Sequence, residues 1–224
     1  MIHFFHGLIG SPLHVQQVCA RLTSPWRAPV LNYLSADIGA GQVASEDTVV
    51  GNSIGCGVAL GFDAARYILT APPFDFSQGA VPLRRAQIGP WVSDLYQGKG
   101  QIEGEAALRA EAVAQLENLL GSRQNLRHIR RLKRQAQGFL TDPRLAQLSH
   151  RVEFVIGAQD YTTPPDAFLS WAAKAAPGAQ VTVLEGCGHA VPVERPEAIA
   201  ALIEKGPRNM PRCGGLNLGS RRSA

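Results

Sequence analysis

The sequence has no long hydrophobic run. Although 45% of its 224 residues are hydrophobic, none of its apolar runs approaches the roughly 20 residues that a membrane-spanning helix needs. The amino-terminal segment has no basic region ahead of its short apolar stretch, which argues against a secretory signal peptide. We therefore expect a cytoplasmic protein that does not associate with membranes.

Cysteine is scarce and carries no metal-binding pattern. No C-x-x-C pair is present, and Cys187 lies too close to His189 to form half of an ordinary zinc site. The sequence also has a G-A-G at residues 39–41, but it lacks the rest of a nucleotide-binding fingerprint. We therefore expect no metal and no cofactor, and only small buried side chains or free thiols at the four cysteines: Cys19, Cys56, Cys187 and Cys213.

Acidic residues are missing from one stretch, residues 123–134, although the net charge of the whole chain is only +4. One interpretation is a solvated helix face. The other is a docking surface for an acidic partner or an anionic substrate. Nucleic acid is not expected here, because no aromatic residue alternates with the basic ones. The stretch contains six basic residues: Arg123, Arg127, Arg130, Arg131, Lys133 and Arg134.

Strand and helix patterns alternate through most of the chain. Short β-branched or apolar runs predict strands at residues 2–5, 29–34, 48–52, 66–70, 151–156 and 180–184. Helical spacing of apolar residues predicts helices at residues 11–22, 55–63, 166–176 and 197–205. Such alternation is typical of an α/β fold with a doubly wound, mostly parallel sheet.

The middle of the chain differs from the rest. Residues 74–150 contain no clear strand, whereas residues 105–120 have the apolar spacing of an amphipathic helix, and residues 125–139 predict a second, basic helix. We interpret this block as a helical cap inserted into an α/β core made of residues 1–73 and 151–205. Residues 206–224 have no apolar periodicity and predict a disordered tail.

A serine lies at the turn between the strand at residues 48–52 and the next helix. Gly51 and Gly55 flank it in a G-x-S-x-G pattern, which lets strand and helix approach closely around an exposed Ser53 hydroxyl. With 23 glycines in the chain, this pattern arises by chance in roughly one sequence in ten. Its interpretation therefore depends on the rest of the chain.

Two further polar residues also follow strands. Asp160 comes after the strand at residues 151–156, and His189 comes after the strand at residues 180–184. A serine hydroxyl is a poor nucleophile unless a base accepts its proton. A histidine can be that base when a carboxylate fixes its tautomer. Ser53, Asp160 and His189 therefore predict a nucleophile, an acid and a base at one edge of the sheet.

The pattern resembles the α/β-hydrolase family. That family has a G-x-S-x-G nucleophile turn, matched by residues 51–55, and a G-x-x-D-x-x-x-P acid segment, matched by residues 157–164. It also has a G-H with a downstream E-x-P-E, matched by residues 188–189 and 194–197. The His6-Gly7 pair matches a strand that ends in His-Gly ahead of the first helix. The resemblance covers about residues 1–205.

The resemblance implies a role for each matched residue. Ser53 would be the nucleophile, His189 the general base and then acid, and Asp160 the residue that orients it. The backbone N–H groups of Leu8 and Ile54 would form the oxyanion hole. The sequence departs from the family in lacking the usual N-terminal hairpin, and the segment from residue 34 to residue 48 is too short for the usual helix.

Three functions follow as candidates. The first is a serine hydrolase that cleaves a carboxylic ester or thioester through an acyl-enzyme. The second is a cofactorless carbon–carbon hydrolase or lyase. The opening segment of the chain resembles that of one such enzyme, a synthase of menaquinone biosynthesis. The third is a catalytically silent binding protein. Asp75 is an alternative acid, whereas His3, His14, His128 and His150 are expected to be surface or packing residues.

Substrate contacts are expected in the cap. Phe74 and Trp91 are candidates to line an acyl pocket. The resemblance further implies that basic cap residues dock an acidic acyl carrier protein or coenzyme A. No motif in the cap identifies the substrate itself. The candidates for this docking role are Arg127, Arg130, Arg131 and Arg134.

Overall fold

Six parallel strands form a single sheet in the order β2-β1-β3-β4-β5-β6. The computed structural model describes residues 1–35, 37–74, 85–97, 102–122, 125, 127–128, 131–132 and 138–206. The order runs outward from β1 in both directions, which confirms the predicted doubly wound α/β fold. The strands are β1 (Ile2–Phe5), β2 (Trp26–Arg27), β3 (Thr48–Asn52), β4 (Arg66–Thr70), β5 (Val152–Gly157) and β6 (Gln180–Leu184).

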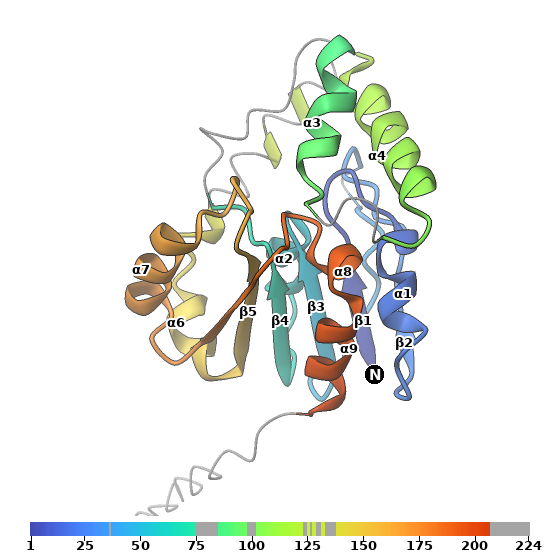
Figure 1. Cartoon of the computed structure of the whole chain (residues 1–224). Helices are drawn as coiled ribbons and strands as arrows, with labels where there is room; N and C mark the ends of the chain where they lie inside the picture. Colours follow the sequence, from blue (N-terminus) through green and yellow to red (C-terminus); the bar gives the residue numbers. More distant parts are fainter. Residues whose placement is uncertain are drawn as a thin grey trace, which may run out of the picture.

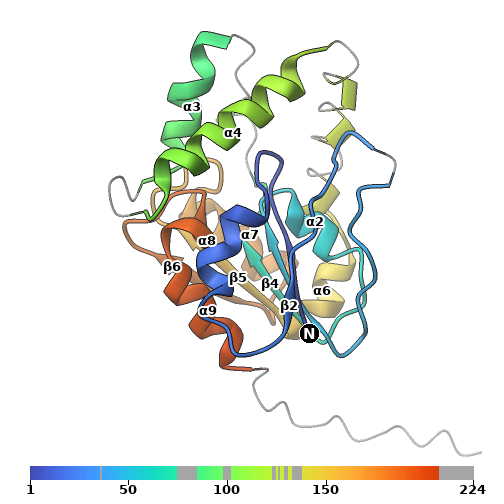
Figure 2. The ribbon, with the colours of Figure 1, turned by 90° about the vertical axis from the view of Figure 1, so that its right-hand side faces the viewer.

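Helices cover both faces of the sheet. Figure 2 shows α1 (Gln16–Cys19), α8 (Val191–Glu194) and α9 (Pro196–Glu204) on one side and α2 (Gly55–Ala59) and α6 (Arg144–Leu148) on the other. The buried side chains of α7 (Pro165–Ala175) belong to the same hydrophobic cluster as those of α2 and α6. The remaining described elements are α3 (Ile88–Asp94), α4 (Glu105–Leu120) and the 3-10 turns η1 (Pro12–Val15), η2 (Arg85–Gln87) and η3 (Ser149–Arg151).

The central strands have apolar side chains on both sides. Phe4 and Val50 pack into the cluster beneath α1, α8 and α9, whereas their neighbours Phe5 and Val49 pack into the opposite cluster. Successive strand residues point to opposite faces. A sheet buried on both faces therefore needs continuous apolar strands rather than alternating ones, and this is what made the strands recognisable in the sequence.

Helices α3 and α4 lie beyond the carboxyl ends of the strands, at the top of Figures 1 and 2. They pack on each other through a small cluster that includes Ile88, Val92 and Leu116. The cluster also contains Ala190, which precedes α8, and Val193, which belongs to α8. These two residues connect α3 and α4 to the rest of the molecule. The boundaries proposed for core, cap and tail stay a prediction, and residues 207–224 lie outside the described residues.

The strand predicted at residues 29–34 is wrong. On the side of β1 away from β3, the strand pairing among the described residues involves Trp26 and Arg27, opposite Ile2 and His3. The chain then turns, and the Leu31 amide donates to the His6 side chain rather than to a strand. Pro29 has no N–H to give to a ladder, which favours the end of the strand before it.

Two predicted helices are shorter than expected. The segment from Ser11 begins with the 3-10 turn η1 before α1, and Ser11 caps it by accepting a hydrogen bond from Leu13 N. Helix α2 ends at Ala59. Helix α3 was not predicted, because Gly89 and Pro90 argue against a helix. Pro90 is tolerated because it occupies the first turn, where backbone N–H groups have no helical acceptor.

Among the residues that the structure describes, no helix has the length and the apolar character needed to cross a membrane.

Candidate active site

The turn after β3 holds Ser53 in a left-handed conformation, with φ of 52°. This conformation is unusual for a residue other than glycine, and it stores backbone strain at a tight turn. The Ser53 amide donates to Thr70 O at 2.9 Å, which fixes the turn against β4. A Cβ on Gly55 would overlap the carbonyl oxygen of Phe5, so this position requires glycine for the helix to pass so close to β1.

Asp160 and His189 form a hydrogen-bonded pair. Asp160 Oδ2 lies 2.8 Å from His189 Nδ1. The carboxylate is buried, and its Oδ1 accepts hydrogen bonds from Thr162 N at 2.8 Å, Thr162 Oγ1 at 2.7 Å and Thr163 N at 3.2 Å. Three donors to one oxygen favour the ionised carboxylate, which can only accept the bond from His189, so the proton of the pair belongs on His189 Nδ1. His189 Nε2 is then free to act as a base.

The pair also shifts the pKa values of both groups. Burial alone would raise the pKa of Asp160, but the charge of His189 and the hydrogen bonds from His189 and Thr162 outweigh burial and lower it. Burial alone would lower the pKa of His189, but the charge and hydrogen bond of Asp160 outweigh burial and raise it above 6.5. The site therefore keeps Asp160 ionised and makes His189 a stronger base.

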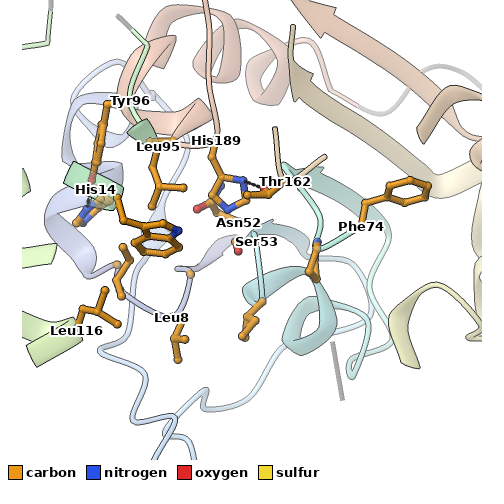
Figure 3. Close-up of a pocket in the computed structure, with 17 residues that line it drawn as sticks. Leu8, His14, Asn52, Ser53, Phe74, Leu95, Tyr96, Leu116, Thr162 and His189 are labelled. Carbon is orange, nitrogen blue, oxygen red and sulfur yellow. Dashed lines mark hydrogen bonds between the residues drawn. The ribbon is translucent and has the colours of Figure 1, made fainter. Parts of the chain in front are cut away.

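Ser53 and His189 line the same pocket. Figure 3 shows the His189 ring directed toward the part of the pocket that holds Ser53, with Thr162 beside it. No hydrogen bond joins the Ser53 hydroxyl to His189 within the part of the chain that the structure describes. Such contacts are often long in enzymes without substrate and shorten in the reactive complex.

The backbone N–H groups of Leu8 and Ile54 belong to residues that line this pocket. Neither amide donates a hydrogen bond to another described residue. The loop that carries Leu8 is fixed by His6, whose Nδ1 donates to Gly7 O at 2.7 Å while its Nε2 accepts from Leu31 N at 2.9 Å. Burial lowers the pKa of His6, which keeps the ring neutral in this bridging role.

The pocket is mostly apolar and opens to solvent. The space between its walls, together with the solvent at its open mouth, is about 830 Å³. Phe74 and Trp91, the two aromatic candidates from the sequence, are both in its wall. The other apolar side chains in the wall come from the segments after β1, β3 and β4, from the end of α3, from α4 and from the residue before α8: Leu8, Ile9, Ile54, Pro73, Leu95, Leu116 and Ala190.

Several residues near the site were missed by the sequence analysis. His14, expected to be a surface or packing residue, lines the pocket beside Tyr96. Thr162 contacts both Asp160 and His189. The spacing D-x-T is visible in the sequence, but nothing there shows that the threonine hydroxyl faces the carboxylate. The His14–Tyr96 contact joins residues 82 positions apart, so no local pattern indicates it.

Glu194 braces the loop that carries His189. Its carboxylate is buried and accepts hydrogen bonds from Gly188 N at 3.0 Å, Ala190 N at 3.2 Å and Gln97 N at 2.8 Å. His189 N and Ala190 N in turn donate to Leu95 O at the end of α3. The matched E-x-P-E pattern contains this residue, but its link to α3 depends on the tertiary fold.

The basic residues of the cap are only partly described. Arg127 and Arg131 are exposed. Arg130 and Arg134 lie outside the described residues, and so does Asp75, the alternative acid. The described residues contain no cluster of three His, Cys, Asp or Glu side chains that could hold a metal ion. Cys19, Cys56 and Cys187 are buried free thiols.

Comparisons with known proteins give a family and a fold. A family model described as "Alpha/beta hydrolase family" matches residues 6–202. No curated protein matches the chain. Solved structures that are similar include a serine hydrolase from the polyaromatic hydrocarbon-degrading bacterium Cycloclasticus zankles, with 16% identity, a TM-score of 0.65, and coverage of 91% of this chain and 88% of that one.

Two further solved structures have comparable similarity. One is the 2-hydroxy-6-oxo-6-phenylhexa-2,4-dienoate hydrolase of Rhodococcus sp. strain RHA1, with 16% identity, a TM-score of 0.65, and coverage of 91% of this chain and 89% of that one. The other is an esterase from Rhodococcus sp. ECU1013, with 17% identity, a TM-score of 0.58, and coverage of 91% and 88%. At these identities the similarity establishes the fold alone.

Proposed function

The chain belongs to the alpha/beta hydrolase family, and from that premise we propose that it is a serine hydrolase that cleaves a carboxylic ester or thioester through an acyl-enzyme. The observation that carries this proposal is the buried Asp160 carboxylate at 2.8 Å from His189 Nδ1, in a pocket whose wall also contains the strained Ser53. A histidine polarised in this way beside an exposed serine is suited to remove the serine proton.

The proposed reaction has two stages. His189 Nε2 accepts the Ser53 Oγ proton while Oγ attacks the substrate carbonyl, and the oxyanion that forms binds the N–H groups of Leu8 and Ile54. His189 then gives its proton to the leaving alcohol or thiol as the acyl–heteroatom bond breaks. In the second stage a water loses a proton to His189, attacks the acyl-serine and releases the acid, and Ser53 recovers its proton.

The character of the pocket favours an ester or thioester over the anionic substrate of the carbon–carbon lyase alternative. Among the described residues in its wall there is no arginine or lysine, and burial in an apolar wall disfavours an unpaired anion. The silent-protein alternative has less support, because a silent protein has no use for a strained serine turn or for a buried ion pair beside it.

The exposed arginines of the cap extend the proposal to the partner. Arg127 and Arg131 are available to an acidic acyl carrier protein or to the phosphates of coenzyme A. Their exchange to glutamate should weaken turnover of a carrier-bound or coenzyme A thioester and leave a small neutral ester unaffected. Equal activity of wild type and the double variant toward both substrates would exclude this docking role.

Labelling with a fluorophosphonate probe tests the central claim, because the probe reacts with activated serines. Wild type should label, whereas Ser53→Ala and His189→Ala should not. Ser45→Ala is the matched control, because Ser45 is exposed and is not part of the pocket wall, and it should label as wild type does. Absence of labelling in folded wild type would overturn the proposal. Labelling would justify a panel of esters, acyl-carrier thioesters and coenzyme A thioesters.

A further inference from the structure

A polar cluster joins the pocket wall to α4. Ser11 Oγ donates to Glu111 Oε2 at 2.8 Å, and His14 Nε2 lies 3.0 Å from the Tyr96 hydroxyl oxygen. The Arg109 guanidinium stacks over the Tyr96 ring at 4.8 Å from its centre. In Figure 3, Tyr96 and His14 lie on one side of the pocket, and Phe74 lies on the other side. The mechanism proposed above uses none of these five polar side chains.

The hydrogen bonds fix the tautomer of His14. The backbone N–H of Ser11 donates to His14 Nδ1 at 3.2 Å, and a backbone amide can only donate. Nδ1 must therefore present a lone pair. Burial is the largest influence on His14 and lowers its pKa to about 4, so the ring is neutral and carries its one proton on Nε2. His14 consequently donates to the Tyr96 oxygen.

Tyr96 then has a hydroxyl hydrogen left to donate. Its oxygen already accepts the bond from His14, and no other hydrogen bond of this hydroxyl is formed with the described residues. The residue is 2% exposed and is part of the pocket wall. A hydroxyl donor in an apolar pocket is costly to leave without an acceptor. Arg109 above the ring also makes the hydroxyl a better donor.

We propose that Tyr96 is a specificity-determining residue that binds a neutral oxygen acceptor in the acyl chain of the substrate. This inference rests on the proposed hydrolase function and narrows its substrate class to esters or thioesters of oxoacyl or similarly oxygenated acids. The rest of the acyl chain would contact the apolar wall. Tyr96 would then select the position of the oxygen along the chain, measured from the carbonyl that Ser53 attacks.

The surrounding charges favour a neutral acceptor over a carboxylate. Arg109 is the one cation of the cluster, and its Nε already binds Glu105 at 2.6 Å. Glu111 adds a second carboxylate, 4.0 Å from His14 Nδ1. Burial raises the pKa of Tyr96 well above its ordinary value, so the phenol remains a proton donor. A keto or ester carbonyl oxygen satisfies the donor without adding another negative charge.

The test compares matched substrates. Nitrophenyl esters of straight-chain acids are assayed beside esters of the same acids that carry one keto group, moved along the chain. Wild type should prefer one keto position over the unsubstituted chain by about tenfold or more in kcat/KM, the value of one well-placed hydrogen bond of about 1.4 kcal/mol. Equal kcat/KM at every position would overturn the proposal.

Tyr96→Phe removes the hydroxyl and keeps the ring, and it should bring the preference close to one. Tyr161→Phe is the matched control, because Tyr161 packs on the same hydrophobic cluster without being part of the pocket wall. The control should keep the preference of wild type. A preference that survives in Tyr96→Phe, or that is lost equally in Tyr161→Phe, would contradict the assignment.

A binding measurement separates this proposal from the hydrolase proposal. Calorimetry with Ser53→Ala compares methyl esters of the best keto acid and of its unsubstituted counterpart, and it does not depend on turnover. Tighter binding of the keto ester, lost in Ser53→Ala/Tyr96→Phe, supports the subsite even if wild type hydrolyses nothing. Equal binding of the two esters rejects the subsite even if wild type is an active hydrolase.

Discussion

In the proposed mechanism the strength of His189 as a base comes from Asp160, and this effect should appear in the pH dependence of the rate. The raised pKa of His189 predicts that kcat/KM increases with pH through an apparent pKa above 6.5, because only the neutral ring accepts the serine proton. Asp160→Asn removes the negative charge that favours the imidazolium, so the acidic limb should move to lower pH. The rate should also fall, by about 10³- to 10⁴-fold. A pH–rate profile of both proteins measures this, and a limb that does not move would contradict it.

The Thr162 hydroxyl positions the carboxylate of Asp160. It donates to Asp160 Oδ1 at 2.7 Å and lies 2.7 Å from His189 Nδ1. Thr162→Val keeps the shape and removes the hydroxyl, so we expect kcat to fall by about tenfold, with Thr162→Ser restoring most of it. Steady-state kinetics and thermal unfolding distinguish a positioning role of Thr162 from a purely structural one. A Thr162→Val protein that is less stable but keeps the kcat of wild type while folded would show a purely structural role.

Glu194 is a second carboxylate whose charge reaches His189. Glu194→Gln replaces one acceptor oxygen by an amide donor, which leaves a backbone N–H of the His189 loop or of Gln97 without its acceptor. We expect unfolding to become easier by about 1–3 kcal/mol and the acidic limb of the rate profile to move to lower pH. Urea unfolding and the pH profile measure the two effects. Glu197→Gln, at an exposed ion pair of α9, is the control and should change neither.

At the level of elements, the loops after β5 and β6 meet at Gly157. A Cβ there would overlap the carbonyl oxygens of Cys187 and Gly188, which are the residues just before His189. Gly157→Ala should therefore displace the His189 loop, cost about 1–3 kcal/mol of stability and lower kcat/KM by at least tenfold. Unfolding curves and kinetics check this.

Gly89→Ala in α3 provides the comparison for that substitution. A Cβ at Gly89 meets open space, and alanine favours a helix over glycine by up to about 1 kcal/mol. We expect this variant to be as active as wild type and equally or more stable. If both glycine variants behaved alike, the close packing of the loops would not be the reason for glycine at position 157.

The elements that the sequence predicted best are those in which local pattern and tertiary burial agree. Strands β1, β3, β4 and β6 and helix α4 have the predicted bounds, because a strand rich in β-branched and apolar residues, or a long helical repeat, leaves no competing pattern. Ser53, Asp160 and His189 were placed at one edge because parallel strands all end on that side. The strand predicted at residues 29–34 lies after Pro29, whereas β2 ends before it. Helix α3 was not predicted, because Gly89 and Pro90 are unfavourable in a helix.

The polar contacts of the pocket could not be predicted in the same way. Ser11 and Glu111 are 100 residues apart in the sequence, and Gln97 and Glu194 are 97 residues apart. Each contact depends on how α3 and α4 lie over the sheet edge. Their partners are ordinary residue types with no fixed spacing, so the sequence shows the residues but not the contacts.

At the scale of the whole molecule, Arg66 joins the sheet to α9 at the edge opposite the pocket. Its side chain is buried, its Nε donates to Glu153 Oε1 at 2.7 Å, and its Nη1 and Nη2 donate to Ile203 O at 3.1 Å and Leu202 O at 2.9 Å. Arg66 pairs with Thr48 at the start of β3, whereas Ser53 follows the end of that strand. A change at Arg66 should therefore alter the free energy of unfolding without altering the reactivity of Ser53.

Arg66→Met should lower the free energy of unfolding by about 3 kcal/mol or more, because it leaves Glu153 and two carbonyl groups of α9 without their donor. The rate of fluorophosphonate labelling per folded molecule should not change. Arg66→Met/Glu153→Leu should recover part of the loss, since removing both charges avoids a partly buried, unpaired carboxylate. Arg21→Ala breaks an exposed ion pair to the same helix and should cost less than about 1 kcal/mol. Urea unfolding of the four proteins measures these differences. A labelling rate that falls with stability in Arg66→Met would mean that α9 and the active-site edge are coupled through the sheet.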